Sequence, residues 1–211
     1  MIIFDEHHYL KMISKILFIL FIPIFIFPQK PGKGKHERSW AIIHPFAAIK
    51  VKKIYNQASL IYNNQVELKK QLDTFSIGGK LDAFRHIFFM AAFSQKVKVK
   101  KLQKLGYAHE KYNYNQFKKQ HLTKTEIPDS ISTVMDLKNN EIGFLIGIEN
   151  KKLKLEDLKI KVMSEIKSGK AFILRRNTVG NYTDCAGNII ELNKLPASWG
   201  NKKCLISSSE N

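Results

Sequence analysis

Three groups of polar side chains interrupt otherwise apolar stretches of this 211-residue sequence, and their residue types are those of enzyme and metal sites. The groups are Asp82, Arg85 and His86; His109 and Glu110; and Asp136, Asn139 and Asn140. Residues three or four positions apart share one face of a helix. Charged and amide groups are costly in a core unless they satisfy one another. We therefore expect the three groups to meet in a buried or cleft-facing polar centre formed by three helices.

One interpretation of this centre is a site for one divalent metal ion, which would be zinc, iron or manganese. Imidazole and carboxylate groups are ligands of these metals in proteins. The candidate ligands are His86, His109 and Asp136. Three protein ligands leave an open position for water, and a water bound to such a metal is a nucleophile near neutral pH.

The remaining polar side chains are the candidate catalytic residues around this metal. Glu110 would act as the general base or as a fourth ligand, and Arg85 would hold an anionic group of the substrate. Asp82 would orient the histidine one turn further along its helix. Asn139 and Asn140 complete the candidate set.

The spacing of these residues leaves two other interpretations open. The zinc pattern H-E-x-x-H is absent, because Asn113 stands three residues after Glu110. Paired Asp–His or Glu–His groups would also suit metal-free general acid and base catalysis. Alternatively, the centre is a structural ion-pair network that fixes the register of the helices. Its members would be Asp82, Arg85, His109 and Asp136.

Three sequence blocks carry a resemblance to a known family. They are D-A-F-R-H at 82–86, A-H-E at 108–110 and M-D-L-K-N-N-E-I-G at 135–143. In this order they resemble a bacterial domain family of unknown function, whose members show D-A-x-R-H, then H-E, then M-D-L-x-N-N-x-x-G. The resemblance covers roughly residues 40–175 and implies that the eight polar residues above are signature positions. It implies no activity.

The elements that must position these residues are mainly helices. The apolar spacing predicts a mainly α protein, a bundle of about four to five helices with an N-terminal apolar segment and a short C-terminal hairpin or extended tail. The expected helices cover 45–64, 80–93, 97–112, 134–148 and 155–168. Residues 66–75 read as a short helix or a loop, and the polar stretch 113–130 reads as a long loop.

Three details of these helices can be predicted from residue type and spacing. The helix that starts at Pro45 should turn its larger apolar side chains inward. These are Phe46, Ile49, Tyr55 and Ile61, with the stem of Lys53. Ser132 is the expected cap of the helix that carries Asp136. From Ile87 to Phe93 the second helix is apolar all round, which predicts a central position.

The N-terminus reads as a targeting or anchoring segment. Ile16 to Phe27 is uncharged and apolar, and Lys11 and Lys15 precede it, as in a signal peptide or a membrane anchor. The predicted organisation is a signal or anchor over 1–28, a linker over 29–39, the helical domain over 40–175 and a C-terminal extension over 176–211. Lysines on the leading side would put the C-terminal domain outside the cytoplasm, in the cell envelope.

The charge and the cysteines add two expectations about the surroundings of the protein. Lys and Arg number 35 against 18 Asp and Glu, for a formal charge of +17. This surface is either simply solvated or binds an anionic envelope lipid or polymer, while nucleic acid is disfavoured because no aromatic residues interleave the basic run at 96–104. Cys185 and Cys204 would form a disulfide in an exported chain and stay two thiols otherwise.

Two functions are compatible with these observations. The first is an exported or membrane-tethered helical protein that acts as a metal-dependent hydrolase through the Asp/His/Glu centre. The alternative is a non-enzymatic cell-envelope protein whose polar core is structural and whose basic surface binds anionic partners.

Overall fold

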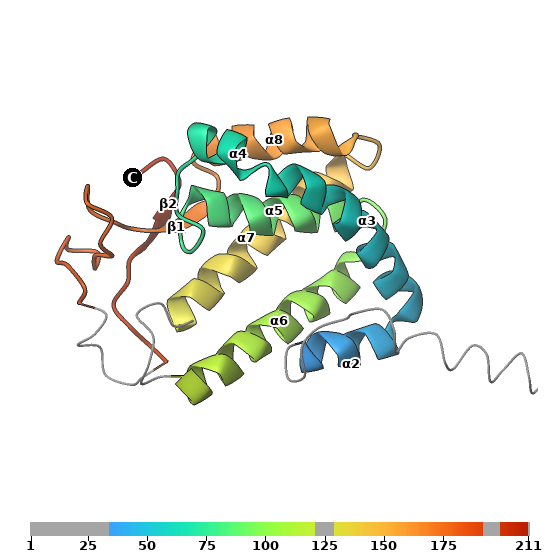
Figure 1. Ribbon diagram of the computed structural model, residues 1–211, viewed down its shortest axis with the longest axis horizontal. Coiled ribbons are helices and arrows are strands. Elements are labelled where there is room, and N and C mark those ends of the chain that lie inside the picture. The colour runs from blue at the N-terminus through green and yellow to red at the C-terminus, as the bar shows by residue number, and fades with distance from the viewer. Residues whose placement is uncertain (1–33, 121–128, 192–198, 211) are drawn as a thin grey trace, which may run out of the picture.

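The computed structural model describes residues 34–120, 129–191 and 199–210, which form a mainly helical protein with one small sheet (Figure 1). The prediction of a mainly α fold is confirmed. The described part of the chain contains seven helices, more than the four to five expected. The elements are α2 (Lys35–Ile43), α3 (Pro45–Asn63), α4 (Gln65–Gln71), α5 (Lys80–Ser94), α6 (Val99–Gln120), α7 (Ser130–Glu149), α8 (Leu155–Lys167), β1 (Phe172–Leu174) and β2 (Leu205–Ser207).

Helices α2 and α4 account for the difference in helix number. α2 begins at Lys35, inside the range that the sequence assigns to the linker, and its Trp40 donates the indole N–H to the Lys101 carbonyl oxygen at 2.7 Å. This bond to α6 holds α2 on the domain. α4 falls in the stretch that reads as helix or loop, and its Leu68 is fully buried.

The predicted signal or anchor segment, residues 1–28, lies outside the residues that the structure describes. Among the helices of residues 34–120, 129–191 and 199–210, we find none with the length and apolarity that crossing a membrane requires.

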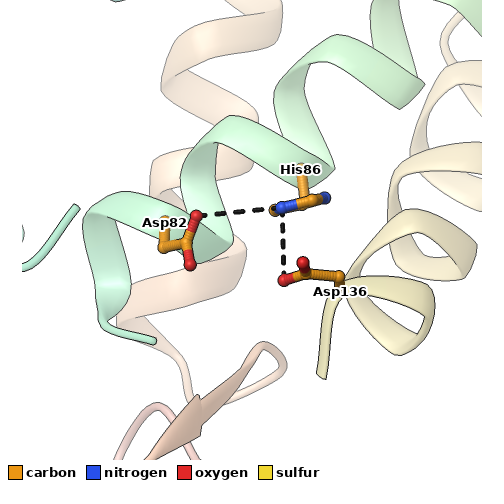
Figure 2. A group of neighbouring side chains, drawn as sticks. All are labelled: Asp82, His86 and Asp136. Carbon is orange, nitrogen blue, oxygen red and sulfur yellow. Dashed lines mark ion pairs between the residues drawn. The ribbon is translucent and has the colours of Figure 1, made fainter. Parts of the chain in front are cut away.

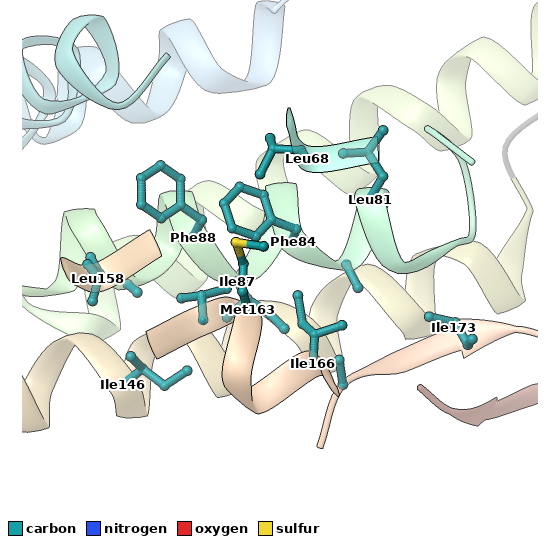
Figure 3. Packing of buried hydrophobic residues seen from close by; sticks show 14 of the residues in the cluster. Leu68, Leu81, Phe84, Ile87, Phe88, Ile146, Leu158, Met163, Ile166 and Ile173 are labelled. Atoms are coloured by element: carbon teal, nitrogen blue, oxygen red, sulfur yellow. The ribbon is translucent and has the colours of Figure 1, made fainter. Parts of the chain in front are cut away.

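Helix α5 lies at the centre of the hydrophobic core, and it packs against α3, α7 and α8. In Figure 1 it runs below α4 and α8, and α7 crosses it at an angle. Figure 3 shows Phe84, Ile87 and Phe88 of α5 packed among side chains of α8 such as Leu158 and Ile166. These apolar side chains point to several sides of α5, and other helices pack against the helix on those sides.

Two glycines of α7 let it approach α5 closely. A Cβ atom added at Gly143 would lie 2.5 Å from the carbonyl oxygen of Ile87, and one added at Gly147 would collide with the carbonyl oxygen of Ala91 and the hydroxyl of Ser94. Real side chains do not come this close, so both positions require glycine. The backbones of the two helices are therefore in direct contact.

The face of α3 that meets the core differs from the predicted one. Phe46, Ile49 and Tyr55 are exposed by 78%, 48% and 52%, and Lys53 is exposed as well, whereas Ile61 packs against the core as predicted. The buried side chains are Ala47, Ala48, Val51 and Ala58. Small residues let α3 pack closely against its neighbours. The stabilisation from this close packing outweighs that from burying the larger side chains, which residue type alone would place inside.

Helix α6 continues well past the predicted end at Tyr112. The expected loop over 113–130 is wrong for residues 113–120, because Tyr114 and Phe117 pack edge-on against Trp199 with ring centroids 4.9 and 5.1 Å apart. These contacts come from the C-terminal extension and cannot be seen in the local sequence.

The C-terminal extension is tied to the helical domain by strand pairing. β1 and β2 are antiparallel, with Ile173 opposite Ile206. Among the described residues of the extension, Ile189 forms an isolated antiparallel bridge with Thr183. A disulfide joins Cys185 to Cys204, directly before β2.

Replacing Gly147 with Ala tests the backbone contact between α5 and α7. An alanine in a helix is normally more stabilising than glycine by about 0.5–1 kcal/mol. Here the added methyl group must displace α5, so we expect a loss of about 1–3 kcal/mol in the free energy of unfolding. Urea titration followed by circular dichroism measures it. Leu145→Ala, an exposed site on the same helix, should change stability little. A gain in stability for Gly147→Ala would contradict the close contact.

Candidate functional site

Three side chains that can ligate a metal converge where α5 meets α7 (Figure 2). Asp82 and His86 lie one turn apart on α5, and Asp136 faces them from α7. His86 Nε2 lies 3.8 Å from Asp82 Oδ1 and 3.2 Å from Asp136 Oδ1. All three residues are buried, and one ligand atom from each lies within 4.8 Å of the other two. We call these three residues the acid–histidine cluster.

The turn before α5 fixes the position of Asp82. Its Oδ2 accepts a hydrogen bond of 2.7 Å from the backbone N–H of Gly78, which has the left-handed φ of 72°. The carboxylate of Asp73 accepts from the N–H groups of Lys80 and Leu81, so it satisfies the free amides at the start of the helix. The Gly78 turn and the start of α5 are thereby held as one unit, and Asp82 is held with them.

The side chain of Asn140 orients His86. His86 Nδ1 lies 3.2 Å from Asn140 Oδ1, and an amide oxygen can only accept, so the proton of the neutral ring is on Nδ1. The lone pair on Nε2 then points toward the two carboxylates of the cluster. Metal-bound histidines in proteins show the same arrangement, with the second ring nitrogen donating to an oxygen.

Burial sets the ionisation of the site. Desolvation is the largest cause that raises the pKa of Asp82, Glu110 and Asp136, and for Asp136 the charges of the other two acids raise it further. Desolvation, helped by the charge of Arg85, lowers the pKa of His86 well below its usual value. The ring is therefore neutral near pH 7. Three acids share one guanidinium, so the site favours an added positive charge, either a proton or a cation.

Glu110 lies beside the acid–histidine cluster, with one of its two oxygens engaged. Its Oε2 accepts hydrogen bonds from the Thr133 hydroxyl at 2.8 Å and from the Asn113 amide at 3.2 Å. Oε1 is buried and has no hydrogen-bond partner among the described residues. Its charge acts on Asp136, which places the two carboxyl groups in one electrostatic site.

Arg85 is the cation nearest to the cluster in this structure. Its Nη2 lies 2.6 Å from Asp82 Oδ1 and 3.0 Å from His86 Nε2, so it donates to the lone pair that a metal would use. The side chain of Arg85 is 40% exposed, whereas that of Asp82 is 4% exposed. Arg85 therefore connects the buried cluster with solvent.

Two of the predicted site residues have other surroundings. His109 is not part of the acid–histidine cluster: its side chain is 48% exposed, and its Nδ1 lies 3.1 Å from Glu37 Oε1 on α2. Adjacent residues of a helix point about 100° apart, and it is Glu110 that α6 turns inward. Asn139 faces away from His86 and exchanges two hydrogen bonds of 2.9 Å with the backbone of Phe172 in β1.

Sequence reasoning missed residues that support the site. Asp73, Asn113 and Thr133 look like ordinary polar residues of loops and helix surfaces. A usable signal exists for Asp73, because an acid shortly before a helix is a common cap. The cap of α7 is Asp129 rather than Ser132: its carboxylate accepts from the Ser132 N–H at 2.8 Å.

A comparison with protein-family models gives the affiliation of the chain. The model described as Domain of unknown function (DUF6973) matches residues 38–170, and the chain belongs to this family. The family resemblance inferred from the three sequence blocks is thereby confirmed. Neither the comparison with curated proteins nor that with solved structures found a match.

The pH dependence of stability tests the state of Asp136. A chelator keeps divalent cations out of the site. The raised pKa of Asp136 then means that the folded protein holds the Asp136 proton more tightly than the unfolded chain does. The stabilisation that this proton gives is complete at low pH and is lost as the pH rises from the unfolded pKa, about 4, through the folded one. Asp136→Asn keeps the shape of the side chain and carries no charge. We expect its melting temperature to exceed that of the wild type increasingly toward pH 8.

Differential scanning calorimetry in chelator from pH 5 to pH 8 measures this difference, at about 2–4 °C for each kcal/mol. Asp157→Asn, an exposed acid on α8, is the control and should follow the wild type at every pH. Parallel curves for the wild type and Asp136→Asn would contradict a raised pKa at Asp136.

Proposed function

We propose that the acid–histidine cluster binds one divalent cation and that the protein is an exported or membrane-tethered metal-dependent hydrolase. The observation that carries this proposal is the convergence of three buried ligand atoms, from Asp82, His86 and Asp136, within 4.8 Å of one another. The identity of the ligands, with two carboxylates to one imidazole, favours manganese, iron or zinc.

The distances within the cluster are compatible with coordination. Metal–ligand bonds to histidine and carboxylate are about 2.1 Å, so two ligands of one ion lie at most about 4.2 Å apart. The separations of 3.2 and 3.8 Å from His86 Nε2 to the two carboxylate oxygens lie within this limit. All three ligand atoms lie within 4.8 Å of one another, so the two carboxylates would have to move closer together around an ion.

The charge of the site supports the same conclusion. Asp82, Asp136 and Glu110 are buried together, and Arg85 supplies one positive charge. Burial, and for Asp136 the charges of the two other acids, raises the pKa of these carboxyl groups and so favours a bound proton or cation. A divalent cation would replace these protons and stabilise the ionised forms of its ligands.

The surrounding residues suggest roles in hydrolysis. A bound cation would supply Lewis acidity and a nucleophilic water near neutral pH. Glu110 has a raised pKa and one unengaged oxygen, as a general base requires. Arg85 would turn outward when a cation takes its place at His86 Nε2, and its exposed guanidinium would then hold an anionic group of the substrate. An anionic envelope lipid or polymer fits this arrangement.

Two features support a location outside the cytoplasm. Ile16 to Phe27 has the composition of a signal or anchor segment. The disulfide between Cys185 and Cys204 is of the kind that persists in oxidising compartments.

Metal binding by the full chain in detergent is the first test. Calorimetric titration with Mn²⁺ and Zn²⁺ should give about one site per chain, weakened at least tenfold by His86→Ala and by Asp136→Asn. Asp157→Asn should bind as the wild type does. If Asp136→Asn folds and binds as tightly as the wild type, the cluster is not the site.

Arg85→Gln separates a metal site from a structural ion-pair network. If a cation competes with the guanidinium at His86 Nε2, this variant should bind Mn²⁺ at least as tightly as the wild type. If Arg85 is the only counterion that the fold uses, the variant should instead lose stability, and Mn²⁺ should not restore it.

Catalysis needs its own measurement. Hydrolysis of a chromogenic phosphodiester should stop in chelator and return with added metal, and Glu110→Gln should lower the rate about 10²–10⁴-fold while still binding Mn²⁺. A variant that retains the wild-type rate would exclude Glu110 as the base.

The location can be tested on cells. Cys185 and Cys204 should react with a maleimide polymer only after reduction, because export would oxidise them. A chain that is fully labelled without reduction would contradict export.

A further inference from the structure

An exposed apolar surface lies where α2 joins α3. Ile42 and Ile43 end α2 and are exposed by 61% and 69%, and Phe46 and Ile49 begin α3 and are exposed by 78% and 48%. Single exposed hydrophobic residues are common on protein surfaces. Four large ones within eight positions, where two helices join, mark a candidate interaction surface. We call these four residues the apolar corner.

Lysines border the apolar corner. Lys50 and Lys53 are exposed and follow Phe46 and Ile49 on the same face of α3, at steps of three and four residues. α3 contains no Asp or Glu along its whole length.

A second pair of lysines approaches the corner from α6. After desolvation, the charges of Lys101 and Lys104 are the causes that lower the pKa of His44, the residue between Ile43 and Pro45. Exposed apolar side chains bordered by lysines, as at the apolar corner, are typical of segments that lie in the surface of an anionic membrane.

The place of the corner in the chain favours a membrane over other partners. α2 begins at Lys35, and the apolar run Ile16 to Phe27 ends only a few residues earlier in the sequence. An extended chain spans at most about 3.6 Å per residue, so the start of α2 lies within about 30 Å of the end of this run. The helical rise of α2 adds about 10 Å, so the apolar corner begins within about 40 Å of the run. In Figure 1, α2 lies at the opposite side of the molecule from α8.

We propose that the apolar corner, Ile42, Ile43, Phe46 and Ile49, docks into the surface of an anionic lipid bilayer. Lys50, Lys53, Lys101 and Lys104 contact the lipid phosphates, and the four apolar side chains enter the boundary between headgroups and acyl chains. This docking turns one side of the helical domain toward the membrane. The docking proposal is argued from the surface of α2 and α3 and is independent of the cation site.

Two tryptophan probes in the full chain test the proposal. Phe46→Trp places a probe in the apolar corner, and Ile160→Trp places the control on α8, where Ile160 is 66% exposed. Both are reconstituted in vesicles of phosphatidylcholine and phosphatidylglycerol, with the wild-type signal of Trp40 and Trp199 subtracted. Lipids brominated on the acyl chain quench tryptophans that enter the bilayer, and acrylamide quenches those that face water.

Bilayer docking predicts that brominated lipid lowers the Phe46→Trp signal at least twofold and that acrylamide has little effect on it. Ile160→Trp should behave in the opposite way. If the probe at position 46 resists both quenchers, another protein surface covers the corner, either a second copy or another segment of this chain, and the proposal fails. If acrylamide quenches both probes equally, the corner faces water and the proposal fails as well.

The contribution of lipid charge is measured with the same probe. Quenching of Phe46→Trp by brominated lipid should fall at least twofold in pure phosphatidylcholine and in a Lys50→Gln/Lys53→Gln background. Equal quenching under all three conditions would overturn the role of the lysines.

Discussion

The backbone contact between α5 and α7 determines how His86 and Asp136 lie relative to each other. Gly143 and Gly147 let the two helices touch without side chains between them. Asp136 lies two turns before Gly143 on α7, and His86 lies directly before Ile87, whose carbonyl oxygen meets that glycine. A helix is stiff over two turns, so the close contact at the glycines fixes the 3.2 Å separation of His86 and Asp136. The packing of small residues is thus what brings a histidine and two acids together in a core.

Burying these charged groups costs free energy, which the rest of the core must offset. Asp82 and Asp136 are both buried, and the charge of each acts unfavourably on the other. Arg85 supplies the nearby positive charge. The hydrophobic core around α5, with Phe84, Phe88 and apolar side chains of α8, supplies the compensating burial. A protein under selection for stability alone would gain by replacing the cluster with apolar residues. Stability alone therefore does not account for the buried acids.

The sequence was sufficient to predict the central helices but not the contacts that these helices make. The spacing of Asp82 and His86 and the all-round apolar run after them predict a central helix with a polar head, because both signals are local. The inner face of α3 and the length of α6 depend on partners far away in the chain, namely the small residues that fit α3 into the core and Trp199 beside Tyr114. His109 and Glu110 are adjacent, and only the rotation of α6 relative to α2 and α7 decides which one turns inward.

The adjacent residues Asn139 and Asn140 show how the C-terminal extension is connected to the site. Asn140 Oδ1 accepts a hydrogen bond from the Nδ1–H of His86, and Asn139, about 100° away around α7, holds the backbone of Phe172 in β1. β1 is paired with β2, and the disulfide precedes β2 directly. Any shift of β1 that rotates α7 moves Asn140 relative to the imidazole and changes the direction of the Nε2 lone pair. The extension after the family domain therefore belongs to the structural support of the cluster, and the disulfide closes a loop within that extension.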